Sequence, residues 1–158
     1  MVSNQVDQRI LGYLGRALSL ELSAVQQYST QAQLLGVWGL TEASKRLRTE
    51  ANEEMGHAER IISRMLALGS APNASQLRPV SLGSSLIEIL QRNYEFEHEL
   101  VHLYEDATLY CERKTDYDNR VFFETLLNEE KTHAIDLATW IAQLGDLTRV
   151  DVMERATF

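Results

Sequence analysis

The motifs Glu54-Met55-Gly56-His57 and Glu130-Lys131-Thr132-His133 decide the fold of this chain, because they are two copies of one longer pattern. In each copy another glutamate, Glu21 or Glu97, stands 33 positions before the glutamate of the motif. The two copies lie 76 residues apart. Chance composition does not readily produce such matching offsets, so we interpret the pattern as one site built from both halves of the chain.

These polar residues occupy positions that a helical period reserves for the core. Apolar residues recur in alternating steps of three and four, which is the spacing of one face of a helix. In the first segment that face contains Leu14, Leu18, Glu21, Val25, Tyr28, Ala32 and Leu35. Three later segments place their glutamates and histidines in the same way, so the pattern predicts a carboxylate near the middle of each apolar face.

Length and composition limit the class of protein. A chain of 158 residues with 44% hydrophobic content predicts one globular domain, residues 1–158, that buries a core without disulfides. The single cysteine, Cys111, excludes an intramolecular disulfide, and we expect it to be a buried apolar residue. No signal-like or membrane-spanning run is found, which predicts a cytoplasmic protein. The net charge of −8 argues against nucleic acid as a partner and is compatible with cations.

Turn-forming residues divide the chain into four helices. We predict helices over residues 5–35, 41–68, 84–113 and 117–144, with a C-terminal tail over 146–158. Both prolines fall in a long loop between Gly69 and Gly83. A short link makes neighbouring helices antiparallel, whereas a loop of about fifteen residues can cross a bundle. The prediction is an all-α four-helix bundle: two antiparallel hairpins joined by a long crossover, plus a short C-terminal segment.

The spacing of the polar residues predicts a metal site. A glutamate and a histidine three positions apart lie one turn apart on a helix and can hold one side of an ion. Buried together, four carboxylates and two imidazoles need cations to neutralise them, and this ligand set suits iron or manganese. A lone Glu-x-x-His is more often a solvated surface, but the matched offsets on apolar faces favour metal. The predicted ligands are Glu21, Glu54, His57, Glu97, Glu130 and His133.

With these residues in view, the chain resembles the bacterioferritins of the ferritin-like superfamily. The resemblance covers about residues 8 to 140 and rests on Glu21, Tyr28, Trp38-Gly39-Leu40, Glu54-Met55-Gly56-His57-Ala58, Glu97 and Glu130-Lys131-Thr132-His133. It implies that Glu54 and Glu130 bridge two irons. It further implies that Glu21 and His57 complete one iron site, and that Glu97 and His133 complete the other.

The resemblance also implies a function. Members of the family are ferroxidases that oxidise Fe(II) to Fe(III) with O2 or H2O2 and store the iron as ferric mineral in a hollow shell. That shell implies a homo-oligomer of twenty-four subunits built from dimers, with a ferredoxin-type protein as the reductant that releases iron. The expected cofactors are a di-iron centre and haem b.

Two residues beside the ligands are further candidates. Tyr28 is a candidate catalytic residue whose hydroxyl would bond a ligand carboxylate and hold its orientation, the alternative being an ordinary core tyrosine. Tyr104 repeats its position in the second copy. For Met55, the resemblance implies an axial haem ligand at a two-fold subunit interface, and a thioether is reasonable chemistry for haem iron. By residue type alone, a helical methionine is more often a packing residue.

Other features favour less specific interpretations or depart from the family. His98 and His102 have a spacing that suits zinc, but their acidic neighbours favour a solvated face. Glu50 and Glu53 belong to a charge run that is partly ordinary helix surface, and both are candidates for facing a cavity and handling incoming iron. Thr49 stands where bacterioferritins often have a histidine, and the tail does not closely match the family's short fifth helix, which makes closure of the shell less secure.

Two alternatives remain open at this stage. A rubrerythrin-like di-iron peroxidase would suit the symmetry of Tyr28 and Tyr104, although the chain has no cysteine-rich electron-transfer module. A non-catalytic helical binding protein would carry the same carboxylates as surface charges. Burial of the glutamates separates the second alternative from the di-iron site.

Overall fold

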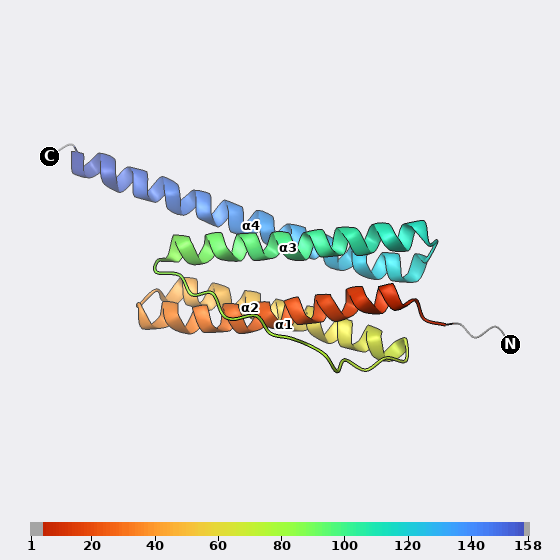
Figure 1. The fold of residues 1–158 in the computed structure, drawn as a ribbon. Helices are drawn as coiled ribbons and strands as arrows, with labels where there is room; N and C mark the ends of the chain where they lie inside the picture. Colours follow the sequence, from red (N-terminus) through yellow and green to blue (C-terminus); the bar gives the residue numbers. More distant parts are fainter. Residues whose placement is uncertain (1–4, 157–158) are drawn as a thin grey trace.

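The described part of the chain folds into four helices. The computed structural model describes residues 5–156, with the side chains of residues 5–146. The helices are α1 (Gln8–Val37), α2 (Thr41–Ala67), α3 (Leu86–Arg113) and α4 (Tyr117–Ala156), and no strand occurs among the described residues. Helix α1 packs on α2 and α3 packs on α4, and contacts between α1 and α3 join the two hairpins (Figure 1). The predicted all-α bundle of two hairpins with a long crossover is confirmed.

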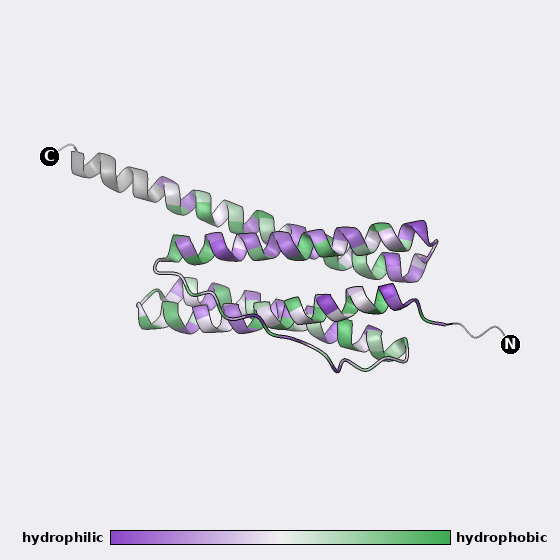
Figure 2. Ribbon diagram, in the orientation of Figure 1, coloured by the Kyte–Doolittle hydropathy of each residue, from purple (hydrophilic) through white to green (hydrophobic). Residues whose placement is uncertain are grey.

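Hydrophilic and hydrophobic residues alternate along the helices (Figure 2), and the buried apolar side chains form the core of the bundle. The core consists of two clusters of buried side chains, one larger and one smaller. On α4, Leu127 belongs to the larger cluster and Leu137 to the smaller, and Glu130 lies between them. The polar site therefore lies in the middle of the helices, with packed apolar side chains on both sides.

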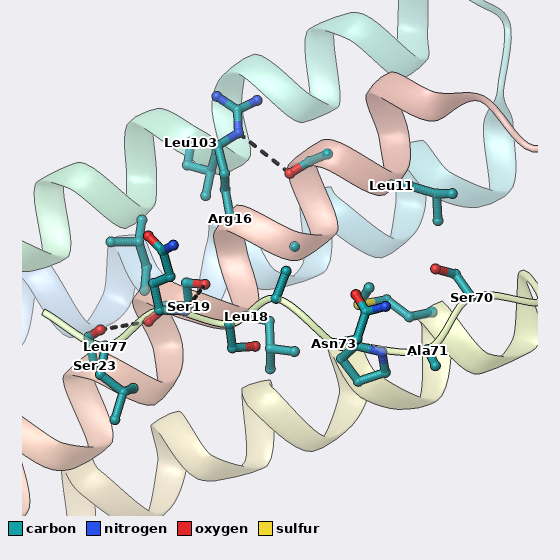
Figure 3. A pocket seen from close by; sticks show the side chains of 18 of the residues that line it. Leu11, Arg16, Leu18, Ser19, Ser23, Ser70, Ala71, Asn73, Leu77 and Leu103 are labelled. Atoms are coloured by element: carbon teal, nitrogen blue, oxygen red, sulfur yellow. Dashed lines mark hydrogen bonds between the residues drawn. The ribbon is translucent and has the colours of Figure 1, made fainter.

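The crossover loop, residues 68–85, runs along α1 for the length of the bundle (Figure 1). A row of polar side chains on α1, spaced four residues apart, holds it. Ser19 and Ser23 accept hydrogen bonds from two loop amides at 3.1 and 3.0 Å (Figure 3). Gln27 accepts one from the Ser81 amide at 3.1 Å, and Gln31 donates one to the Ser81 carbonyl at 2.9 Å. This row keeps the loop against the helix.

The helix ends follow local capping chemistry. The Asp7 carboxylate accepts a hydrogen bond from the Arg9 amide at 2.8 Å, so α1 begins at Gln8 and not at residue 5. Ser85 caps α3 by accepting a hydrogen bond from the Glu88 amide at 3.2 Å, so that helix begins at residue 86 and not at 84.

The fourth helix is longer than predicted. We predicted an end at residue 144 before Gly145, but α4 continues through Gly145 to Ala156 and projects beyond the other helices (Figure 1). A glycine inside a helix costs about 1 kcal/mol, which weakens a helix without ending it, and no proline follows. Among the described residues the tail is thus a continuation of α4. No helix in this part of the chain is long and apolar enough to cross a membrane.

Candidate metal centre

The four glutamates of the repeated pattern meet in the middle of the bundle. Each helix contributes one, and each side chain is at most 1% exposed. Their oxygens and the histidine nitrogens form two overlapping groups in which all ligand atoms lie within 4.8 Å of one another. One group contains Glu21, Glu54, His57 and Glu130, and the other contains Glu54, Glu97, Glu130 and His133. All six side chains predicted as ligands therefore come together at one place.

Glu54 and Glu130 belong to both groups and occupy its centre. Glu54 directs one oxygen toward each histidine, with Oε1 at 2.7 Å from His133 Nδ1 and Oε2 at 3.3 Å from His57 Nδ1. Glu130 also directs one oxygen toward each histidine, but its shorter contact is to His57: Oε1 lies 2.6 Å from His57 Nδ1, and Oε2 lies 3.4 Å from His133 Nδ1. Each of these two glutamates therefore faces both histidines.

Glu21 and Glu97 lie at the two ends of the cluster, and each accepts a hydrogen bond from a buried tyrosine. Tyr28 on α1 donates to Glu97 Oε1 at 2.7 Å, and Tyr104 on α3 donates to Glu21 Oε1 at 2.6 Å. The sequence suggested a Tyr28 bond to a ligand carboxylate, and the partner is the glutamate of the opposite helix. No role was predicted for Tyr104, although the repeated offset had singled it out.

The outer nitrogens of the two histidines face two further carboxylates. His57 Nε2 lies 2.9 Å from Glu129 Oε2, and His133 Nε2 lies 2.8 Å from Glu53 Oε2. The glutamate before each motif thus supports the histidine of the other motif. Glu129 was missed from the sequence, although both motifs read Glu-Glu-x-x-His, and that repetition was the available signal.

Buried polar atoms that have no hydrogen-bond partner outside the ligand cluster test whether the site suits cations. In the described part of the chain, eight such side-chain atoms occur, and all belong to the six predicted ligands: Glu21 Oε2, both oxygens of Glu54, His57 Nδ1, Glu97 Oε2, both oxygens of Glu130 and His133 Nδ1. Buried carboxylate oxygens that no group outside their own cluster satisfies are costly and rare in folded proteins. Because all eight belong to one cluster, the donor set fits divalent metal ions of the hard or borderline kind.

The charge state of the side chains supports the same interpretation. Burial raises the pKa of Glu21 and Glu130 well above the ordinary value of 4.5, and it also raises the pKa of Glu97. Burial disfavours the charged ring of His57, yet the carboxylates around it raise its pKa to about 12. By the same balance the pKa of His133 rises to about 10. The raised pKa values of these five side chains favour protons at the places where cations would otherwise supply the positive charge.

Glu54 is the exception among the four glutamates. Its burial acts to raise the pKa, but hydrogen bonding from Glu21 and both histidines outweighs burial, so its pKa falls below the ordinary range. Glu54 therefore remains the ionised carboxylate at the centre of the cluster.

The cluster opens to solvent through a pocket of about 430 Å³ between α2 and α4, here called the histidine pocket. It is lined by Glu53, Gly56, His57, Arg60, Glu129, Thr132, His133 and Asp136. A larger groove of about 1120 Å³ lies between α1 and the crossover loop (Figure 3), and its lining residues include no acid, histidine or cysteine. The histidine pocket is the one that leads to the candidate ligands.

The remaining candidates from the sequence lie elsewhere. Met55 is on the surface of α2 with 38% of its area exposed, outside both ligand groups. His98 and His102 are exposed and belong to no candidate metal cluster among the described residues. Cys111 is fully buried, as expected. Burial of all four glutamates is contrary to the alternative in which they are surface charges.

Comparison with known proteins decides the family. The family model described as "Ferritin-like domain" matches residues 11–147. The bacterioferritin of Rhodobacter capsulatus is 37% identical over 86% of this chain and 84% of its own. The chain belongs to the bacterioferritin family. A second bacterioferritin, from Mycobacterium leprae, is 32% identical over 90% of both chains.

Solved bacterioferritins also share the fold. The structure of R. capsulatus bacterioferritin superposes with a TM-score of 0.87 at 36% identity, covering 90% of this chain and 89% of that one. That structure is described as having a metal-free dinuclear site and a haem iron in a crystallographic special position. Membership of the bacterioferritin family supports iron storage as the general function, and the carboxylate and histidine cluster fits a di-iron site.

Proposed function

We propose that this bacterioferritin oxidises Fe(II) to Fe(III) at a di-iron centre within each subunit, with O2 or H2O2 as the oxidant, and stores the product as mineral. The observation that carries the proposal is the pair of overlapping ligand groups that share Glu54 and Glu130. A site with two shared carboxylates and one histidine at each end is built for two ions, not one.

In this proposal, Glu54 and Glu130 would help to hold both irons, because each directs one oxygen toward each histidine. Glu21 and His57 complete the ligands of one iron. Glu97 and His133 complete those of the other. Both histidines would bind through Nδ1, because their Nε2 atoms face the outer carboxylates.

The protein residues favour oxidation by their charge and their rigidity. Carboxylates are hard donors that stabilise Fe(III) relative to Fe(II). When bound, the two irons supply one electron each, which together reduce one molecule of a two-electron oxidant. Tyr28 and Tyr104 hold the terminal carboxylates of Glu97 and Glu21 in place, and the core packed around the four glutamates leaves the histidine pocket as the access to the site.

We also propose a haem b ligand in Met55. The side chain is a partly exposed thioether on a helix surface, and a side chain added at the adjacent Gly56 would meet nothing within 4 Å. The Met55 thioether would hold the haem iron at an interface with a two-fold-related subunit. The haem iron in the special position of the R. capsulatus protein supports this arrangement.

Membership of the bacterioferritin family also supports a proposal about assembly. We propose a shell of twenty-four subunits built from dimers, which takes up Fe(II) and releases its iron when a ferredoxin-type protein reduces the mineral. The C-terminal tail bears on closure of the shell. Among the described residues it extends α4 as far as Ala156 and does not fold as a separate short helix.

Oxygen uptake on addition of Fe(II) tests the proposed activity. The protein should consume O2 rapidly, and Glu54→Ala or His133→Ala should abolish the fast phase. His102→Ala is the matched control, because that histidine is 75% exposed and lies outside the cluster. Fast oxidation that survives both cluster variants would contradict the proposal. The mass of the purified assembly separates a shell, on the order of half a megadalton, from a dimeric peroxidase.

A further inference from the structure

The histidine pocket is built from four pairs of residues that are each 76 positions apart. The pairs are Glu53 with Glu129, Gly56 with Thr132, His57 with His133, and Arg60 with Asp136. Contacts in the two halves also match. The Nε2 atoms of the two histidines lie 2.9 and 2.8 Å from their outer glutamates, and the two tyrosine-to-glutamate hydrogen bonds are 2.7 and 2.6 Å long. The pocket therefore lies across an approximate two-fold axis inside one subunit.

The pair Arg60 and Asp136 breaks this symmetry, because the two side chains carry opposite charges. Arg60 Nη1 donates to Glu129 Oε2 at 2.7 Å, and the same oxygen lies 2.9 Å from His57 Nε2. At the equivalent position of the other half, the arginine is replaced by Asp136. Within the described side chains, Glu53 contacts His133 but has no lysine or arginine within 4.0 Å.

The two histidines are consequently supported to different degrees. Glu129 Oε2 is held by two groups, His57 Nε2 and Arg60 Nη1, so this oxygen has little freedom to move. Glu53 is held on one side only, and its side chain is 50% exposed. The ring of His133 is also more exposed than that of His57, at 14% against 6%. A histidine whose outer carboxylate is fixed offers its other nitrogen to a metal with less loss of freedom.

Charge and orientation act on the two subsites in opposite directions. Asp136 stands in the second half where Arg60 stands in the first, so the second half is more negative and attracts cations more strongly. However, these charges are about half exposed, so their effect is roughly fivefold at most and is screened by salt. Complete loss of an outer carboxylate partner of a metal-bound histidine changes metal affinity by about 10- to 100-fold, and a carboxylate that is present but less firmly held, such as Glu53, should cost about tenfold, the lower end of that range. At moderate salt, orientation is therefore the larger effect.

We propose that Arg60 is a positioning residue which, through Glu129, fixes His57 and makes the two metal subsites unequal. The inference rests on the proposed di-iron centre. The subsite of Glu21 and His57 binds a divalent cation more tightly, and the subsite of Glu97 and His133 binds it more weakly. Arg60 touches neither cation.

Co(II) binding measured by its visible absorption tests this proposal without any turnover. Two half-site proteins isolate the subsites: His133→Ala keeps the half of His57, and His57→Ala keeps the half of His133. In 0.3 M salt the first should bind one Co(II) about tenfold more tightly than the second. Equal affinities in the two half-site proteins would overturn the inference.

Variants of Arg60 and Asp136 distinguish a role in positioning His57 from a role in supporting the fold. Arg60→Met should weaken Co(II) binding about three- to tenfold in the His133→Ala protein and leave binding in the His57→Ala protein unchanged. Arg60→Lys should restore most of the loss, because it returns the charge beside Glu129. Asp136→Asn is the matched control and should change affinity no more than about twofold in either background. If Arg60→Met affects both halves equally, or neither, the inference is wrong.

Failure of the inference is distinguishable from failure of the proposed function. Full-length protein with all six ligands should take up two Co(II) per chain in two steps. Two equal steps refute only the inequality of the subsites, whereas no stoichiometric uptake refutes the di-iron centre as well. Arg60→Met in this background should bring the two steps together, which guards against a half-site protein that folds poorly.

Discussion

Tyr104 on α3 donates a 2.6 Å hydrogen bond to Glu21 on α1, and both side chains are fully buried. Tyr28 on α1 returns the relationship by bonding Glu97 on α3 at 2.7 Å. Each hairpin thus supplies the tyrosine that orients a carboxylate of the other hairpin. The two bonds tie the halves of the bundle together at the site itself.

The tyrosine pair gives the first prediction. Tyr104→Phe and Tyr28→Phe should each slow Fe(II) oxidation by about tenfold, because a ligand carboxylate loses its orienting donor. Each variant should also destabilise the metal-free protein by about 2 kcal/mol, measured by chemical denaturation, since a buried carboxylate loses a hydrogen bond. A normal rate in Tyr104→Phe beside a slow Tyr28→Phe would mean that Tyr104 only fills space.

The stability of the metal-free protein should fall as the pH rises from 6 to 8. His57 and His133 have raised pKa values, so their contribution to stability is complete below the ordinary value of 6.5 and declines above it. The raised carboxylates act in the same direction above 4.5. The lowered pKa of Glu54 contributes stability that is lost only below 4.5, outside this window. Thermal melts at constant ionic strength measure the trend.

Metal ions should reverse this pH dependence. Cations have to displace the protons that the site retains, so binding releases protons and strengthens as the pH rises. Each displaced proton changes the binding free energy by about 1.4 kcal/mol per pH unit. Zn(II) should therefore raise the melting temperature more at pH 8 than at pH 6. An equal rise at both values would show that the cluster is already free of protons.

Met55→Leu should remove haem without affecting the di-iron chemistry. Leucine keeps the apolar volume but has no sulfur to bind iron. The Soret absorbance of protein reconstituted with haem should fall to the background of non-specific binding, while the initial rate of Fe(II) oxidation stays within about twofold. Unchanged Soret absorbance would assign the haem to other residues.

A buried amide network predicts a purely structural effect. Asn93 accepts a hydrogen bond from Gln27 at 3.0 Å and donates one to Gln31 at 2.7 Å. Asn93→Leu would leave both glutamines without these partners and should cost about 2–4 kcal/mol of unfolding free energy. Thr30→Ala is the control, because that hydroxyl is exposed and bonds only its own helix, so its effect should stay within about 0.5 kcal/mol. Metal stoichiometry should be normal in both variants.

Much of the fold and of the candidate site was predictable. Apolar residues at helical spacing predicted four helices, and the offsets of Glu21, Glu54, Glu97 and Glu130 predicted that they would meet. The helix ends were less predictable, because capping and glycine effects near 1 kcal/mol compete there. Gly145 is the clearest case, since a residue that often ends a helix lies inside α4.

The sequence by itself determined which residues face the core and which glutamates and histidines share it, because helical periodicity is a local property of the chain. Only the tertiary structure decided which partner each polar group finds. Tyr104 lies 83 positions from Glu21, and Glu129 lies 72 positions from His57, so no local pattern relates them. Those pairings arise because antiparallel packing sets the rotation and height of one helix against another, and hydrogen bonds then form between whichever groups the packing brings within 3 Å.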